Sequence, residues 1–157
     1  MLSAAARRPL AAAWFGFFGF LASSLFFLRP GIKLPALCLY VLAPAIAATL
    51  AGSFWGAAIL DPTKTQTPGA AMLRGLGVTA GAFAIFAVLY ALGLPLLERG
   101  WKMSQAGGIL VAALTLGLVM VGPLIAISGM LAGLTLFLLG RRATAAPGDQ
   151  ASNHPAV

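Results

Sequence analysis

The sequence predicts an all-α integral membrane protein in which four transmembrane helices form an antiparallel bundle. The chain has 157 residues, of which 61% are hydrophobic and only 8% are charged. A helix needs roughly 20 apolar residues to cross the hydrocarbon core of a bilayer. Four stretches reach that length without a charged side chain, and every charge lies between or outside them. They are residues 9–28, 34–60, 75–97 and 103–140.

The spans predicted within these stretches are helical because a lipid-exposed backbone must satisfy its own hydrogen bonds. A transmembrane β-barrel would alternate apolar and polar residues in short segments, whereas these stretches are continuously apolar. The spans and their connectors form one domain, residues 1–142. Residues 143–157 are rich in Ala, Pro and small polar residues, so we expect a disordered cytoplasmic tail there. The four spans are residues 10–28, 35–60, 75–97 and 108–139.

The first span follows Arg7 and Arg8 and therefore resembles a secretory signal peptide. The hydrophobic part of such a signal has about 7–15 residues and leads to a cleavage site between small residues. Here the apolar run continues over residues 10–28 and ends at an Arg-Pro pair without a clear cleavage site. We therefore expect an uncleaved transmembrane helix.

The second and fourth spans are longer than a bilayer requires, and each has a proline near its middle, Pro44 or Pro123. A straight helix over residues 109–139 would be about 46 Å long, against a hydrocarbon core of about 30 Å. Proline removes a backbone hydrogen bond, so we expect both helices to be kinked there. The alternative is a hinge or break that lines a cavity, as in some transporters. Thr49 and Ser128, each five residues after a proline, are then the candidate polar lining.

The distribution of lysine and arginine predicts the orientation. Six basic residues lie at the two termini and in the middle connector, and four lie in the two short turns. Cytoplasmic segments carry the excess of Lys and Arg, so both termini are expected in the cytoplasm. The bias toward Ala, Gly and Leu suggests a bacterium of high GC content, and hence a bacterial inner membrane. The six basic residues are Arg7, Arg8, Lys64, Arg74, Arg141 and Arg142.

Small residues recur at spacings of three and four in the spans. Helices in lipid associate where small side chains let their backbones come close, and alternating steps of three and four give one continuous seam. Phe residues such as Phe15 and Phe17 surround the seam of the first span and are expected to face lipid or a partner. Packing within one chain is the default, and homo-oligomerisation is the alternative. The predicted packing glycines are Gly16, Gly19, Gly52, Gly56, Gly77, Gly81, Gly122, Gly129 and Gly133.

The chain resembles two related helical hairpins. Each half has a short basic turn followed by a long span, and the segments after the two prolines share the pattern P-x-I-A-x-[ST]. The distance from the turn lysine to the proline is 11 residues in one half and 21 in the other. Internal duplication is therefore a hypothesis, based on weak symmetry of the kind found in transporters.

The uncharged spans exclude several functions. Ion pumps, proton relays and carriers of charged substrates need ionisable groups within the membrane. The acids nearest the spans, Asp61 and Glu98, are predicted on opposite faces and cannot act together on one substrate. One cysteine, Cys38, and one histidine, His154, make no metal site, and no cofactor is expected. The ten basic residues are scattered at span ends, which does not suit binding to nucleic acid.

We expect a small membrane protein without a catalytic site. Its predicted role is that of an accessory or assembly subunit, or of a homo-oligomer packed through its small-residue faces. The expected partners are the lipid bilayer and either other membrane subunits or a second copy of the chain. The alternative is a channel or carrier for a small neutral or apolar solute, with Thr49 and Ser128 as its polar lining.

Overall fold

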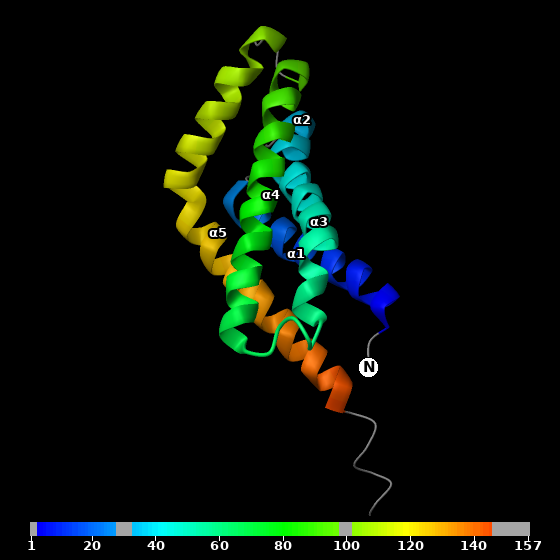
Figure 1. Cartoon of the computed structure of the whole chain (residues 1–157). Helices are drawn as coiled ribbons and strands as arrows, with labels where there is room; N and C mark the ends of the chain where they lie inside the picture. Colours follow the sequence, from blue (N-terminus) through cyan, green and yellow to red (C-terminus); the bar gives the residue numbers. More distant parts are fainter. Residues whose placement is uncertain (1–2, 28–32, 98–101, 146–157) are drawn as a thin grey trace, which may run out of the picture.

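The computed structural model describes residues 3–27, 33–97 and 102–145. Within these residues every regular element is helical, which confirms the all-helical prediction (Figure 1). In chain order the elements are α1 (Ala4–Phe27), α2 (Leu34–Leu37), the π-helix η1 (Cys38–Leu42), α3 (Ala43–Trp55), the 3₁₀ helix η2 (Gly56–Leu60), α4 (Pro68–Leu97), the 3₁₀ helix η3 (Met103–Gln105) and α5 (Ala106–Ala145).

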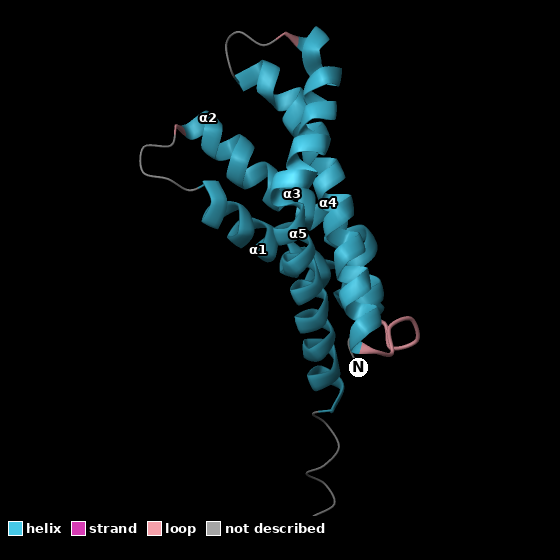
Figure 2. Ribbon diagram, turned by 90° about the vertical axis from the view of Figure 1, so that its left-hand side faces the viewer, coloured by secondary structure: helices cyan, strands magenta, loops and turns pink. Residues whose placement is uncertain are grey.

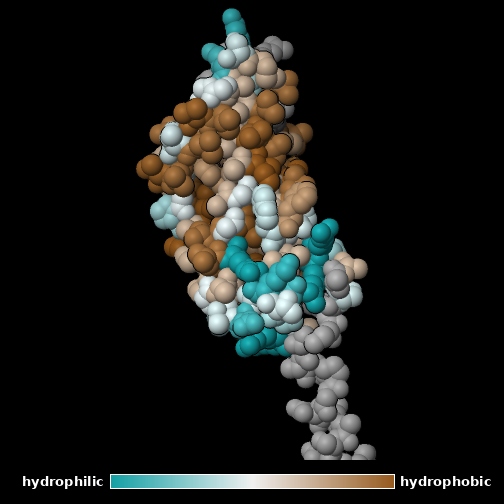
Figure 3. All heavy atoms as spheres, in the orientation of Figure 1, coloured by the Kyte–Doolittle hydropathy of each residue, from teal (hydrophilic) through white to brown (hydrophobic). Residues whose placement is uncertain are grey.

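Three segments of the described chain are long and apolar enough to cross a membrane: Cys38–Leu60, Pro68–Leu96 and Met103–Ala143. They correspond to the second, third and fourth predicted spans, and they suggest a membrane protein. The first predicted span, residues 10–28, falls on α1 except for its last residue, which lies outside the described residues. Its crossing of a membrane stays a prediction. Figure 3 shows hydrophobic side chains over the middle of the molecule and hydrophilic ones gathered mainly toward the end where α5 finishes.

α4 begins at Pro68, seven residues before the predicted span. Proline suits the first turn of a helix because it lacks an N–H that would have no partner there. The Thr67 hydroxyl accepts a hydrogen bond from the Ala70 N–H at 3.2 Å, which caps the helix. α4 therefore includes Arg74, a residue that a span defined by the absence of charge leaves out.

α5 runs past its predicted end at residue 139 and finishes at Ala145. Arg142 lies in its last turn, where positive charge interacts favourably with the carbonyl end of a helix. The first residues of the predicted tail, 143–145, are therefore helical. The rest of that tail, residues 146–157, lies outside the described residues, as do the two turns around Arg29 and Arg99.

The π-helix η1 immediately precedes Pro44 in the second span. Pro44 lacks an N–H and its ring crowds the carbonyl four residues earlier, that of Tyr40 at the centre of η1. The wider π turn lets the Ala43 N–H bond to the Cys38 carbonyl, five residues back. The chain thus accommodates this proline through a local change of helix type, and π-helices occur mostly as such single turns within longer helices.

Pro123 produces no such change of helix type, because α5 is α-helical throughout its length. Figure 1 shows that α5 is nevertheless not straight, since its first and second halves run in different directions. That the two prolines cause kinks stays a prediction. Internal duplication also stays a hypothesis, because a π-helix comes just before α3 and its Pro44, whereas only α-helix comes before Pro123.

The helices form two antiparallel hairpins joined side by side. α1 packs along α3, α4 packs along α5, and α3 packs along α4 to connect the pairs (Figures 1 and 2). The contacts show the direction of the first pair: Ala11, early in α1, lies against Gly52, late in α3, whereas Gly19 lies against the earlier Pro44. In the second pair, Ala71 lies against Gly133 and Phe83 against the earlier Gly117.

Two buried clusters hold the hairpins together. The larger cluster lies toward the end where α1 begins and is centred on Phe15, Ile59 and Leu136, which are at most 1% exposed. The smaller cluster lies toward the opposite end and joins η1, α4 and α5 through Leu39, Leu94 and Ile109. Between the two clusters α5 is poorly covered, and this gap positions the site described next.

Candidate functional site

The helices of the first hairpin come closest at the glycines predicted there. A methyl group built on Gly52 would lie 2.8 Å from the Ala11 carbonyl oxygen and 2.9 Å from Phe15 Cβ. On Gly19 it would lie 2.6 Å from Ala48 Cβ. Real side-chain carbons essentially never come this close, so these positions need glycine if α1 and α3 are to keep their separation. The four glycines at this contact are Gly16, Gly19, Gly52 and Gly56.

The second hairpin has a similar contact, with one difference from the predicted residues. Gly129 and Gly133 of α5 face α4, and a methyl group on Gly75 would lie 2.8 Å from Gly133 Cα. A methyl group on Gly77 would meet no atom within 4 Å. The contact glycine of α4 is therefore Gly75 and not the predicted Gly77, because Gly77 lies on another face of the helix.

The two remaining predicted glycines behave differently from each other. A methyl group on Gly81 would lie 2.5 Å from the Trp55 ring, so Gly81 lies where α4 meets α3. A methyl group on Gly122 would meet only Leu118 of its own helix, at 3.5 Å. Gly122 is thus not at a helix contact within the chain, and its predicted packing role needs a partner outside it.

The Phe-rich surface predicted for the first span is divided between the interior and the exterior. Phe17 is 56% exposed, as a lipid-facing or partner-facing residue would be, whereas Phe15 is 1% exposed and belongs to the core. Trp14 also faces inward, and its indole N–H donates a hydrogen bond to Thr135 Oγ1 at 3.2 Å. The expectation that Phe15 faces outward is wrong, because α3 and its glycines receive that side of α1.

The proposed polar lining at Thr49 and Ser128 is not brought together. Thr49 is exposed, lies against Gly16 and donates its hydroxyl proton to the Ala45 carbonyl at 2.8 Å. Ser128 lines a cavity between the hairpins but donates to the Ile125 carbonyl of its own helix at 3.0 Å. The two hydroxyls therefore do not form a shared polar lining, and of the two residues only Ser128 lines the cavity.

The cavity beside Ser128 has a volume of about 140 Å³ and lies among α1, α3, α4 and α5. Phe15, Phe18 and Phe83 make up much of its apolar wall, and Pro44 lines it as well. The hydroxyls of Ser23 and Thr79 also line it, but each donates to a backbone carbonyl of its own helix. Such a cavity suits an apolar group, because its few polar atoms are already bonded within the protein.

A larger groove of about 760 Å³ continues from this cavity along the first half of α5. The cavity and the groove share Phe27, Phe83, Phe86 and Val121 in their walls. The volume falls in the range of about 300–1,000 Å³ that is typical of sites for small molecules, which are mostly lined by hydrophobic and aromatic side chains. The α5 side of the groove consists of Ser104 and Gln105 at its end, followed by Gly108, Ile109, Ala112, Ala113, Leu116, Gly117 and Val121.

Aromatic rings form the wall opposite α5. Tyr40 stacks on Phe27 with ring centres 5.4 Å apart and lies 5.8 Å from Tyr90, which in turn lies 5.7 Å from Phe86. The Tyr40 and Tyr90 hydroxyls are 3.4 Å apart and share a hydrogen bond. This cluster was not predicted from the sequence. Its residues come from three separate segments, so no spacing along the chain brings them together.

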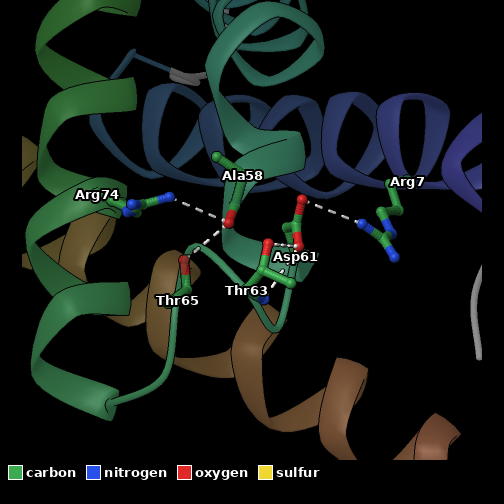
Figure 4. Close-up of polar contacts among 6 residues, drawn as sticks. All are labelled: Arg7, Ala58, Asp61, Thr63, Thr65 and Arg74. Atoms are coloured by element: carbon green, nitrogen blue, oxygen red, sulfur yellow. Dashed lines mark hydrogen bonds and ion pairs between the residues drawn. The ribbon is translucent and has the colours of Figure 1, made fainter.

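A group of polar contacts lies at the ends of the helices, where the first hairpin joins the second (Figure 4). Arg7 Nη1 lies 3.3 Å from Asp61 Oδ2, which ties the start of α1 to the connecting loop. Asp61 Oδ1 accepts hydrogen bonds from the Thr63 hydroxyl at 2.7 Å and the Thr63 N–H at 3.1 Å. These two bonds, with a smaller contribution from Arg7, hold the pKa of Asp61 below its usual value.

The carbonyl of Ala58 is the second centre of this group. It accepts hydrogen bonds from the Thr65 hydroxyl at 2.7 Å and from Arg74 Nη1 at 3.2 Å (Figure 4). Both bonds add to the one that the Asp61 N–H donates to the same carbonyl, at 3.4 Å, where η2 ends. Because the same end of the molecule holds the start of α1 and the end of α5, the six basic residues predicted for the cytoplasmic side gather there. Which side of a membrane this end faces stays a prediction.

The fold and the site together define a class: a small helical protein suited to a membrane, with an apolar groove between its helices. Among the described residues no group of three His, Cys, Asp or Glu side chains could hold a metal ion. No family model, no curated protein and no solved structure matches this chain.

Proposed function

We propose that this chain is a small, non-catalytic membrane protein that acts as an accessory or assembly subunit of a larger complex, or as a homo-oligomer. The observation that carries the proposal is the uncovered outer face of the first half of α5. On the sides of this half that no other helix covers, Val111, Leu118, Val119 and Met120 are between 61% and 79% exposed. Contiguous exposed apolar surface is typical of sites that contact lipid or other proteins.

The outer face of α5 also suits a protein partner by its composition. Met120 has a flexible side chain that adapts to different neighbours. Gly122 lies one helical turn after the exposed Leu118 and contacts no other helix among the described residues. In lipid, helices associate through small residues rather than through hydrophobic burial. Gly122 can therefore provide the close approach that a second helix needs.

Crosslinking within the native membrane tests this proposal. We would introduce Met120→Cys in a Cys38→Ala background and measure disulfide or maleimide crosslinks after mild oxidation or treatment with a bifunctional reagent. The matched control is Leu25→Cys, which is equally exposed at 79% but lies on α1. A discrete crosslinked species from Met120→Cys alone is expected. Equal yields from both positions, or none from either, would contradict an assembly through α5.

We propose both termini in the cytoplasm of a bacterium, with the spans in its inner membrane. Six basic residues at one end and four in the turns at the other support this orientation. Labelling of single cysteines by a membrane-impermeant maleimide tests it. Gln66→Cys should be protected in intact cells and Lys102→Cys should react, since both side chains are exposed, and the opposite pattern would reverse the orientation.

The second candidate function is a channel or carrier for a small neutral or apolar solute. The observation in its favour is the continuity of the 140 Å³ cavity with the larger groove beside α5. Liposomes that contain the protein should then take up such a solute faster than protein-free liposomes. Unchanged permeability would rule out the channel or carrier, against which the exposed position of Thr49 also counts, and the assembly role would be the one remaining candidate.

A further inference from the structure

We propose that the groove between α4 and α5 holds one acyl chain of an anionic phospholipid, with the phosphate headgroup beside η3. This inference rests on the proposed placement of the chain in a bilayer. It assigns a ligand to the groove, whereas the assembly proposal concerns the opposite, outer face of α5.

The groove exists because the same face of α5 meets two different surfaces of α4. In its second half this face carries Gly129 and Gly133, which pack directly on Gly75. In its first half it meets Phe83, whose ring would lie 2.8 Å from a methyl group on Gly117. Bulky rings therefore hold the first half of α5 away from α4, while glycines bring the second half close.

The walls of the groove suit a hydrocarbon chain. Small residues such as Ala112 and Ala113 form the α5 wall and leave room inside the groove. The flat rings of Phe86 and Tyr90 give the opposite wall a broad apolar surface. Carbon atoms attract one another most strongly at about 3.5–4.0 Å, and atoms that line a void have no such neighbour on one side. A chain of methylene groups would supply these neighbours along the whole groove.

The dimensions of the groove favour an acyl chain over a second transmembrane helix as its occupant. The distance from Gln105 to Val121 along α5 is about 24 Å at 1.5 Å per residue. The empty space of the groove is about 1440 Å³ even when its open side is counted. The mean cross-section is then about 60 Å², or about 9 Å across, whereas a helix with its side chains needs about 10–12 Å. One acyl chain needs much less.

On the α5 side of the groove the polar residues lie at one end, and this gives the ligand a direction. Ser104 and Gln105 line that end, and the remaining α5 wall is apolar. Lys102, just before η3, is exposed at this end. A lysine ammonium group binds phosphate as a point charge. An amphiphile with a phosphate beside Lys102 and an apolar tail toward Val121 matches this arrangement.

Native mass spectrometry tests the proposal on the full chain. The protein would be reconstituted into vesicles with equal amounts of phosphatidylglycerol and phosphatidylcholine, extracted in a mild detergent, washed and weighed with its retained lipid. We expect one phospholipid per chain, with phosphatidylglycerol retained at least threefold over phosphatidylcholine. Lys102→Gln should bring this ratio close to one without removing the lipid. A washed protein that retains no phospholipid would overturn the proposal.

A matched pair of variants locates the lipid. Ala113→Phe fills the groove and should lower the retained lipid at least fivefold, while Thr115→Phe, on the exposed side of the same helix turn, should leave it unchanged. Ala113→Leu should give an intermediate loss, and equal helix content by circular dichroism shows that each variant folds. Equal loss in Ala113→Phe and Thr115→Phe, or loss of a dimer mass in place of lipid, would assign the groove to another occupant.

Flotation of the wild-type protein with membranes separates this test from the proposed function. A protein that floats but retains no lipid disproves the groove proposal alone. A protein that does not float with membranes disproves both. The crosslink at Met120 reports on assembly independently of either result.

Discussion

The guanidinium group of Arg7 lies 3.3 Å from the carboxylate of Asp61, and this ion pair ties the first helix to the loop between the two hairpins. Because Thr63 and Arg7 hold the pKa of Asp61 below its usual value, the ionised carboxylate stabilises the folded chain. That contribution is fully present above the unfolded pKa of roughly 4 and is lost as the pH falls through the lower folded value.

We therefore expect Asp61→Asn to lower the Tm at pH 7, and the difference from wild type to shrink as the pH falls below roughly 4. Thermal unfolding in detergent, followed by circular dichroism at several pH values, measures this. Arg8→Gln is the control, because Arg8 neighbours Arg7 in sequence and no ion pair joins it to Asp61. A difference between wild type and Asp61→Asn that stays constant with pH would contradict the linkage.

The contrast between Gly75 and Gly77 gives a prediction of opposite signs. Gly75→Ala introduces a methyl group 2.8 Å from Gly133 Cα and should destabilise the fold by about 1–3 kcal/mol, as other overpacking substitutions do. Gly77→Ala meets open space and should be neutral or stabilising by up to about 1 kcal/mol, because alanine favours a helix. Unfolding in mixed detergent and denaturant measures both, and equal effects would refute the contact.

Phe15 and Phe17 form a second matched pair on one helix. Phe15→Ala empties a core site that is 1% exposed and should cost about 3–5 kcal/mol of stability. Phe17→Ala, at a site that is 56% exposed, should change the free energy of unfolding much less. If the two variants lose equal stability, then both sides of α1 are buried, and a partner or a different packing of α1 would have to cover Phe17.

The hydroxyl of Ser23 connects α1 to the irregular part of the second span. It donates to the Val41 carbonyl in η1 at 3.2 Å, as well as to carbonyls of its own helix. Ser23→Ala should cost about 0.5–1.5 kcal/mol, the usual net value of a protein hydrogen bond. Ser53→Ala, whose hydroxyl bonds to Leu50 of its own helix, should have little effect on the same unfolding curve.

Hydropathy alone predicted the helical class and the positions of the second, third and fourth spans, because a long apolar run leaves the backbone few alternatives. Their ends were harder to predict. Arg74 lies inside α4 because the helix begins at Pro68, and its side chain reaches the Ala58 carbonyl. The absence of charge therefore marks the apolar part of a helix and not the helix itself.

The spacing of glycines predicted that the helices have small-residue faces. It did not show, for every helix, which of its small residues face the neighbouring helix. Gly77 and Gly81 fit the GxxxG pattern as well as any pair in the chain. The position of α5 nevertheless selects Gly75, which belongs to the series Ala71, Gly75 and Thr79. The spacing of that series is also regular in the sequence. Which of the two sets contacts α5 depends on where α5 packs.

Thr49 and Ser128 show why equal sequence patterns can have different surroundings. Both follow a proline by five residues, yet α1 lies against Thr49 while the gap beside α5 leaves Ser128 next to a cavity. Likewise, the contact of Arg7 with Asp61 joins positions far apart in the chain. Such pairings depend on the order in which the helices pack, which no local pattern contains.

The contact between Gly75 and Gly133 has a mechanical consequence for the rest of α5. Gln105 lies 28 residues before Gly133, or about 42 Å away along the helix. A tilt of about 5° around the glycine contact would move Gln105 by about 4 Å at that length. The fit of the glycines at one end of the molecule therefore contributes to the width of the groove at the other end.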